Sequence, residues 1–91
     1  YEKKLLEKFF NSLGKNPEMT PYHFEDVKKV LGMGAVDVLI FSKEYDKDKA
    51  HELKVVAAQM GTKIEIVSTE TEEGDQFNKL GGIGAMQRFR V

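Results

Sequence analysis

The chain has 91 residues, enough for one domain, and its charge is nearly balanced, with 14 basic and 15 acidic side chains. A domain that binds nucleic acid mainly by neutralising phosphates carries a basic excess, so DNA or RNA contact is not expected to be its main source of affinity. The chain has no cysteine, which excludes disulfides, thiolate zinc sites and thiol chemistry. No apolar run approaches the roughly 20 residues that span a bilayer, so no membrane contact and a soluble cytoplasmic protein are expected.

The first half of the chain predicts two helices and a strand. Apolar residues from Leu5 to Leu13 recur at helical spacing and predict a helix over 1–13, which Gly14 ends. Because no capping residue precedes Tyr1, we expect this helix to continue upstream and the chain to be a fragment of a longer protein. A loop over 15–21 leads to a helix over 24–32. The nearly continuous apolar run over 35–42 then predicts a strand covered on both faces.

The second half predicts a crossover connection and a compact tail. A helix over 46–60 and a β-branched strand over 62–68 complete a βαβ unit with the first strand. A short helix over 72–80 and a last strand over 85–91 follow. The pattern indicates an α/β domain whose sheet has three or four strands, with helices on both faces.

Three groups of residues resemble ligand sites, and each has a simpler explanation. His23 and His51 lie on different helices and share no carboxylate, so no metal site is expected. The acidic run over 70–75 suits the positive end of a helix that Thr71 caps. Phosphate-binding loops open a helix after a strand, whereas the tail glycines follow a helix and precede a strand. We therefore interpret the structural loop as a chain reversal; its glycines are Gly81, Gly82 and Gly84.

The sequence offers no catalytic residues and no cofactor motif, because no nucleophile is paired with a base and no two carboxylates oppose each other. We therefore expect a protein that is not an enzyme. The methionines at 33, 60 and 86 are expected to fill the core. Alternation along the last strand gives it an outward face and an inward face. The outward face, with Met86, Arg88 and Arg90, fits either a protein interface or ordinary amphipathicity. The inward face places Gln87 with Phe89 and Val91, and the polar Gln87 has no explanation there.

Three stretches of the sequence are familiar together. They are Glu2-Lys3-Lys4-Leu5-Leu6 with Phe9-Phe10, the segment 32–37 with the sequence Gly-Met-Gly-Ala-Val-Asp, and the tail segments 72–77 (Glu-Glu-Gly-Asp-Gln-Phe), 81–85 (Gly-Gly-Ile-Gly-Ala) and 88–91 (Arg-Phe-Arg-Val). Through them the whole chain resembles the C-terminal domain of the class-1 peptide chain release factor of eukaryotes and archaea. The resemblance implies a three-layer α/β/α sandwich with a small mixed sheet, of a type shared with small ribosomal proteins.

The resemblance also implies a role in translation termination. In the complete factor other domains read the stop codon and carry a Gly-Gly-Gln loop for peptidyl-tRNA hydrolysis, and the C-terminal domain docks a translational GTPase of the elongation-factor type. This chain has Gly81-Gly82-Ile83 and no Gly-Gly-Gln, so neither codon reading nor hydrolysis is expected, and ribosome contact is expected through the full-length factor. The paralogous Pelota rescue factor, whose tail usually has alanine where this chain has Gly84, is one alternative. A ribosomal-protein-like RNA-binding module is another.

The docking surface is expected to combine the first helix with the final loop and strand. The predicted partner-binding residues are Leu6, Phe9, Ile83, Met86 and Arg88. Many relatives insert a small subdomain after the first strand, sometimes with zinc held by cysteines. Here only a short loop over 43–47 stands at that place, so the zinc role does not carry over.

Overall fold

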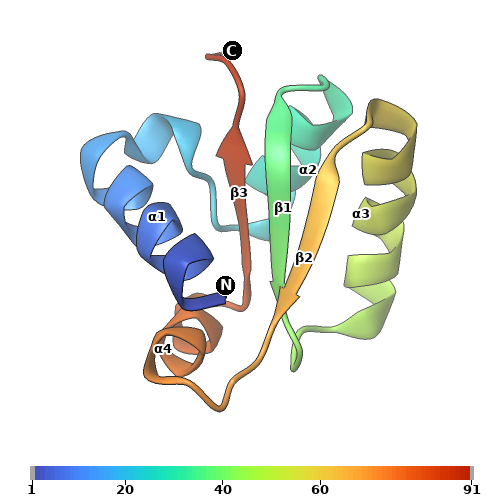
Figure 1. Cartoon of the computed structure of the whole chain (residues 1–91). Coiled ribbons are helices and arrows are strands. Elements are labelled where there is room, and N and C mark those ends of the chain that lie inside the picture. The colour runs from blue at the N-terminus through green and yellow to red at the C-terminus, as the bar shows by residue number, and fades with distance from the viewer. Residues whose placement is uncertain (1, 91) are drawn as a thin grey trace.

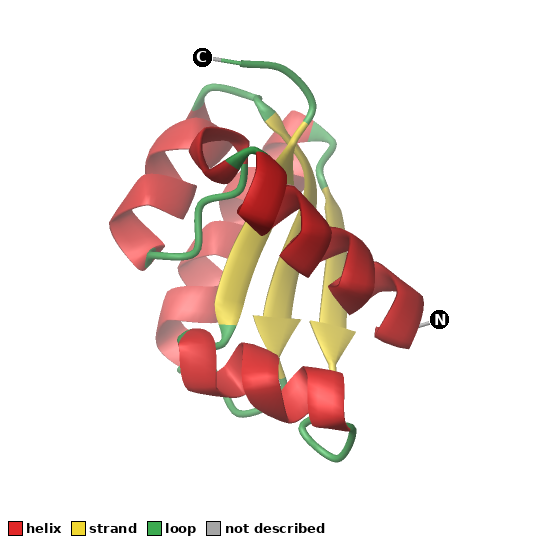
Figure 2. Cartoon of the chain, turned by 90° about the vertical axis from the view of Figure 1, so that its left-hand side faces the viewer, coloured by secondary structure: helices red, strands yellow, loops and turns green. Residues whose placement is uncertain are grey.

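A computed structural model describes residues 2–90 of the chain. Within them the elements are, in order, α1 (Glu2–Lys15), the 3-10 helix η1 (Pro17–Met19), α2 (Phe24–Gly32), β1 (Val36–Ser42), α3 (Lys47–Met60), β2 (Lys63–Val67), α4 (Glu72–Leu80) and β3 (Ile83–Gln87). Helices α1 and α4 cover one face of the sheet, and α2 and α3 cover the other (Figures 1 and 2). This arrangement confirms the predicted α/β fold with three layers.

The sheet is mixed, as expected, and β1 is its central strand. The strand order is β2-β1-β3, with β1 parallel to β2 and antiparallel to β3. Helix α3 makes the crossover between the parallel pair, which such a pair requires. The outer edge of β3 is partly closed, because the N–H of Ala85 donates to the carbonyl of Pro21 at 3.0 Å. The outer edge of the sheet at β2 carries no further strand among residues 2–90.

An irregularity at Asp37 sets which side chains of β1 face each layer. Val36 is paired with Gln87 and Val38 with Met86, so the register shifts by one residue between them. A β-bulge of this kind leaves one residue outside the pairing. Asp37 is that residue, and it is exposed. The shift explains why an acidic residue interrupts an otherwise apolar strand.

Two apolar clusters form the core, one on each face of the sheet. The first lies under α2 and α3 and includes Leu31, Leu39, Leu53 and Ile83. The second lies under α1 and α4 and consists of Leu6, Phe9, Ile40, Val67, Phe77 and Met86. Because β1 and β3 contribute side chains to both clusters, neither core forms without them.

Three differences from the expected elements exceed one residue, and the other boundaries agree to within one residue. Helix α1 continues through Gly14 to Lys15, and the expected start at Tyr1 lies outside the described residues. The expected loop over 15–21 contains η1. The last strand was expected over 85–91 and instead runs from Ile83 to Gln87. It ends there because Gln87 is already paired with Val36, the first residue of β1.

Gly84 lets helix α1 approach the sheet closely. A Cβ atom built on Gly84 would lie 2.5 Å from two atoms of the Phe9 ring and 3.1 Å from the ring of Phe77. Phe9 and Phe77 pack edge to face, with ring centroids 5.3 Å apart and planes at 87°. A side chain at position 84 would separate these three elements.

We expect Gly84→Ala to lower the free energy of unfolding by about 1–3 kcal/mol, the usual cost of overpacking a core. The backbone of Gly84 is not in the left-handed region, so the cost is steric. Gly14→Ala is the matched control, since a Cβ atom built on Gly14 would have no neighbour within 4 Å. Urea unfolding followed by circular dichroism measures both variants. Equal stabilities for the two would contradict the close contact with Phe9.

Gly74 has a second spatial requirement, at the start of α4. A Cβ there would lie 1.8 Å from the carbonyl oxygen of Ser68, while the Gly74 N–H donates to the Thr71 hydroxyl at 2.9 Å. The obstruction is backbone, which moves less easily than a side chain. We therefore expect Gly74→Ala to destabilise the domain more than Gly84→Ala does, measured by the same urea unfolding. A smaller loss at position 74 would show that the first turn of α4 shifts freely.

Candidate docking surface

The structure places four of the five predicted partner-binding residues in the core. Leu6, Phe9 and Met86 belong to the cluster under α1 and α4, and Ile83 belongs to the cluster on the opposite face. The expectation that these four side chains together form a contact surface is therefore wrong for this conformation. Their apolar side chains, which suggested an interface, are used to pack the two layers. Only Arg88 is exposed.

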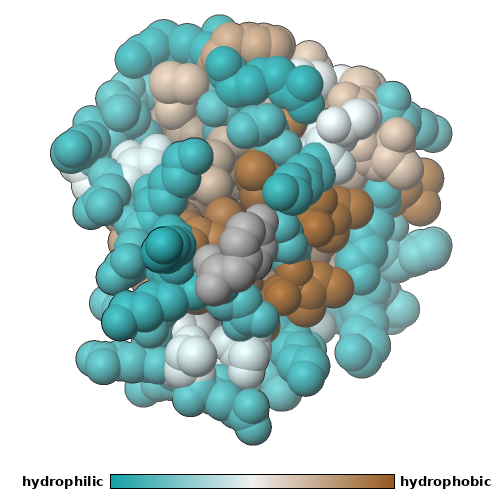
Figure 3. All heavy atoms as spheres, viewed as in Figure 1, coloured by the Kyte–Doolittle hydropathy of each residue, from teal (hydrophilic) through white to brown (hydrophobic). Residues whose placement is uncertain are grey.

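Met86 nevertheless borders a surface groove. The groove has a volume of about 530 Å³ between α1 and the sheet and is lined by Leu5, Val38 and Met86, with lysines along its rim. Figure 3 shows hydrophobic atoms reaching the surface near the middle of this face. The first helix and the last strand therefore share an accessible surface, although most of the residues expected there lie beneath it.

Arg88 is held at the end of the sheet by hydrogen bonds to β1. Its N–H donates to the carbonyl of Ala35 at 2.7 Å, and its guanidinium donates to the carbonyl of Val36 from Nε at 3.2 Å and from Nη2 at 2.5 Å. The same Val36 carbonyl accepts the hydroxyl of buried Thr62 at 3.0 Å. The Val36 carbonyl oxygen thus links β1 to the residue that precedes β2 and to the residue that follows β3.

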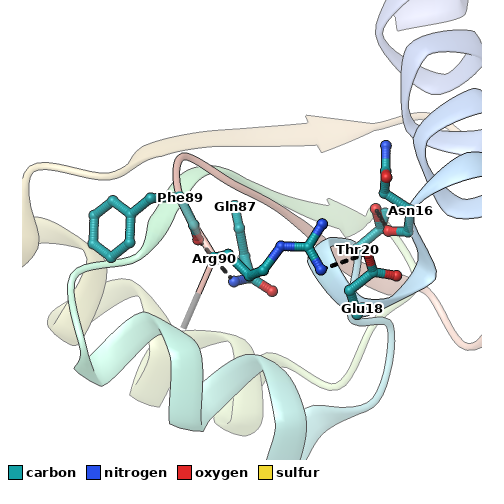
Figure 4. Close-up of polar contacts among 6 residues, drawn as sticks. All are labelled: Asn16, Glu18, Thr20, Gln87, Phe89 and Arg90. Carbon is teal, nitrogen blue, oxygen red and sulfur yellow. Dashed lines mark hydrogen bonds and ion pairs between the residues drawn. The ribbon is translucent and has the colours of Figure 1, made fainter.

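The tail after β3 folds against η1 (Figure 4). Arg90 forms an ion pair with Glu18 at 3.0 Å, and the amide of Gln87 donates to the carbonyl of Phe89 at 3.1 Å. Gln87 is half-buried and does not enter the core, so the expectation that it faces the core is wrong. A cleft of about 290 Å³ lies beside this tail and is lined by residues that include Tyr22, Lys29 and Gln87.

Large apolar side chains are exposed at this end of the molecule. Phe89, Met33 and Met60 are 48%, 51% and 38% exposed, and we call these three residues the end patch. A Cβ atom built on Gly34, the residue after Met33, would lie 3.7 Å from the Sδ atom of Met60. In Figure 1 the C-terminal tail, the loop before β1 and the end of α3 all lie along the top of the molecule, from left to right. In Figure 3 tan, moderately hydrophobic spheres lie along the same margin.

The sequence patterns predicted buried positions for the three residues of the end patch, and these predictions are wrong. Met33 and Met60 were expected to fill the core, and among the methionines so assigned only Met86 does. Phe89 was expected on an inward strand face with Val91, which lies outside the described residues. The positions of the two methionines relative to the predicted helices could have revealed the patch, because Met33 follows one helix and Met60 ends another. Residues at helix ends leave the buried face of the helix.

The tail glycines form the expected chain reversal. The N–H groups of Gly81 and Gly82 donate to the carbonyls of Asn78 and Phe77, each at 3.1 Å, and the carbonyl of Gly82 accepts the N–H of Ser42 at 2.8 Å. Gly82 has a φ of 76°, which favours glycine. Because the N–H groups of Gly81 and Gly82 already donate to carbonyls of α4, they do not form a phosphate-binding loop.

The remaining candidates lie apart from one another. His23 precedes α2 and stacks on Tyr22 at 4.3 Å between ring centroids, and His51 lies on α3. Residues 2–90 contain no cluster of three or more histidine or acidic side chains arranged to hold a metal ion. Thr71 caps α4, as expected, and the acidic side chains follow it in the first turn. None of the described helices is both long and apolar enough to cross a bilayer.

Comparison with known proteins identifies one family. A family model described as eRF1 domain 3 matches residues 1–91. Peptide chain release factor subunit 1 of Thermococcus onnurineus is 30% identical over 137 residues, which cover 99% of this chain and 33% of the release factor. The protein pelota homolog of Pyrococcus abyssi is 34% identical over 94 residues, which cover 99% of this chain and 26% of the homolog.

A solved structure supports the same assignment. A structure described as ribosome-bound archaeal Pelota and ABCE1 matches 99% of this chain and 26% of its own, with a TM-score of 0.82 and 30% identity. The chain thus spans about a third or less of the proteins it matches. Over its length the chain belongs to the eRF1 domain 3 family, which includes the C-terminal domains of archaeal release factors and Pelota proteins.

Proposed function

We propose that this chain is the C-terminal binding module of a class-1 release factor and that it docks a translational GTPase of the elongation-factor type. The observation that carries the proposal is the family match over residues 1–91. The module is not itself an enzyme in this proposal, because the reaction depends on a Gly-Gly-Gln loop in another domain of the resembled factor. Its contribution to termination is to bring the GTPase to the factor.

We place the GTPase contact at the end patch and the two arginines beside it. Aromatic, methionine and arginine side chains are enriched where proteins contact each other. Phe89 lies between Arg88, whose guanidinium is bonded to Val36, and Arg90, which is paired with Glu18. Groups already held in place lose little conformational entropy on binding. The proposed contact therefore combines an apolar patch with two arginines whose side chains are already held in place.

The ribosome is the expected site of action. The archaeal Pelota structure that matches this chain is described as ribosome-bound, with ABCE1. We propose that the present chain likewise works on the ribosome, in the cytoplasm, as part of a full-length factor. Nothing in this role requires the domain itself to read a codon.

A Pelota-type rescue factor is the second candidate, and the lengths of the matches favour it. The release factors align over 137 residues with a chain of 91, so they carry residues in this region that the chain lacks. The Pelota homologs of Pyrococcus align over 94, nearly the same length as the chain. A peptide-release assay with a full-length factor carrying this domain separates the candidates, since a release factor acts only at stop codons.

We expect Phe89→Ser to weaken binding of the GTPase about 30-fold, because an aromatic anchor at the centre of an interface contributes about 2 kcal/mol. Isothermal titration of the domain with the GTPase measures the change. Ile66→Ser is the matched control, since Ile66 is 47% exposed against 48% for Phe89 and lies near the other end of the sheet. If the wild-type domain shows neither a heat change nor NMR chemical-shift changes when titrated with the GTPase, GTPase docking is wrong. If only Ile66→Ser weakens binding, the location is wrong.

Arg88→Glu tests the arginine separately. We expect it to weaken GTPase binding and also to lower the free energy of unfolding by about 1 kcal/mol, through loss of the bonds to the Val36 carbonyl. Arg90→Glu, which breaks only an exposed ion pair with Glu18, should leave stability nearly unchanged. Titration and urea unfolding of both variants give the two quantities. Unchanged affinity in Arg88→Glu would remove that residue from the docking surface.

A further inference from the structure

The end of the sheet opposite the end patch contains a basic cleft. It has a volume of about 400 Å³ and lies where the parallel strands β1 and β2 end and α3 begins. Lys43, Lys47 and Lys54 line it, together with His51 and Tyr45. In open α/β sheets ligands commonly bind outside the carboxyl ends of the strands. The position of the cleft is therefore typical of a binding site.

The charge around this cleft differs from that of the whole chain. The formal net charge of the chain is −1, yet no carboxylate among the described residues lines the cleft. The acidic residue that precedes α3, Asp46, accepts hydrogen bonds from the N–H groups of Asp48 and Lys49, so its carboxylate serves as the helix cap. The fold thus gathers three lysine side chains at one site although the sequence alternates acidic and basic residues there.

The cleft also offers an aromatic surface and an apolar floor. Tyr45 is half-buried beside the buried ring of Phe41, with centroids 5.6 Å apart, and the Nζ of Lys54 lies 5.9 Å from the Phe41 centroid. Ile66 on β2 completes the floor. Burial, with a smaller effect from the charge of Asp46, raises the pKa of the Tyr45 hydroxyl, so the ring carries no negative charge that would repel a phosphate. Lysines beside a partly exposed ring suit a phosphate backbone that carries unpaired bases.

We propose that this cleft binds a short segment of single-stranded RNA, with its phosphates against the three lysines and one base stacked on Tyr45. A duplex fits less well, since its bases are not free to stack on the ring. The site is independent of the GTPase contact, because the end patch lies at the amino end of β1 and the cleft at its carboxyl end. The balanced net charge of the chain is compatible with a local basic site of this kind.

Fluorescence anisotropy with a labelled oligo(U) of about eight nucleotides tests the proposal on the 91-residue chain. Three phosphate contacts predict a slope of about −2 for the logarithm of the binding constant against that of salt concentration. We expect the triple variant Lys43→Gln, Lys47→Gln, Lys54→Gln to bind at least about 10-fold more weakly, with a slope near zero. The matched control is Lys3→Gln, Lys8→Gln, Lys29→Gln, which removes the same charge from exposed positions elsewhere and should bind almost as the wild type.

Substitutions of the ring test stacking. Tyr45→Ala should weaken binding by about 5-fold or more, whereas Tyr45→Phe should retain it. Equal losses of affinity in the two triple lysine variants would overturn the proposal. So would a duplex of equal charge that binds as tightly as oligo(U), or a wild-type chain that does not bind oligo(U) at about millimolar concentration. Circular dichroism verifies folding. If Tyr45→Ala does not fold, the lysine series and the duplex comparison decide the matter.

Discussion

The contact between the Phe9 ring and the backbone of β3 at Gly84 determines how the rest of the domain is arranged. It sets the distance between α1 and the sheet, and the same ring packs edge to face with Phe77 on α4. One aromatic side chain therefore positions two helices and a strand. Gly74 meets a similar requirement where α4 passes the carbonyl of Ser68. The glycines of the tail are thus explained by close packing and by the positive φ angles of Gly81 and Gly82, and no ligand is needed to account for them.

The bulge at Asp37 links this packing to the candidate docking surface. The bulge shifts the register of β1 against β3 by one residue. Beside it, the carbonyl of Val36 accepts hydrogen bonds from the hydroxyl of Thr62 and the guanidinium of Arg88. These bonds fix the direction in which the chain leaves β3. Phe89 consequently lies at the end of the molecule. A continued, extended strand would instead have placed it above the sheet. A local backbone irregularity thus decides which side chains a partner meets.

The sequence predicted most of the fold because helix and strand periods are properties of short segments. The helix over 24–32 and the three layers follow from such periods. The last strand was misjudged because its end depends on where β1 begins, far away in the chain. The docking residues were misjudged for a related reason: apolar character alone does not distinguish an interface from a core, and Leu6 and Phe9 are core residues. The lysine cleft depends on the loop after β1, whose course no periodicity reveals.

The central position of β1 between β2 and β3 has a consequence for how the domain folds. The parallel pairing with β2 becomes available once α3 has formed, but β3 is separated from β1 by α3, β2 and α4. Both apolar clusters need side chains from β3, since Ile83 belongs to one and Met86 to the other. A nascent chain that has not yet supplied Ile83–Gln87 therefore exposes two incomplete cores, one on each side of a two-stranded sheet. Pairing between strands that are distant in the sequence slows folding. The pairing of β3 with β1 is therefore the step that commits the domain to its native state.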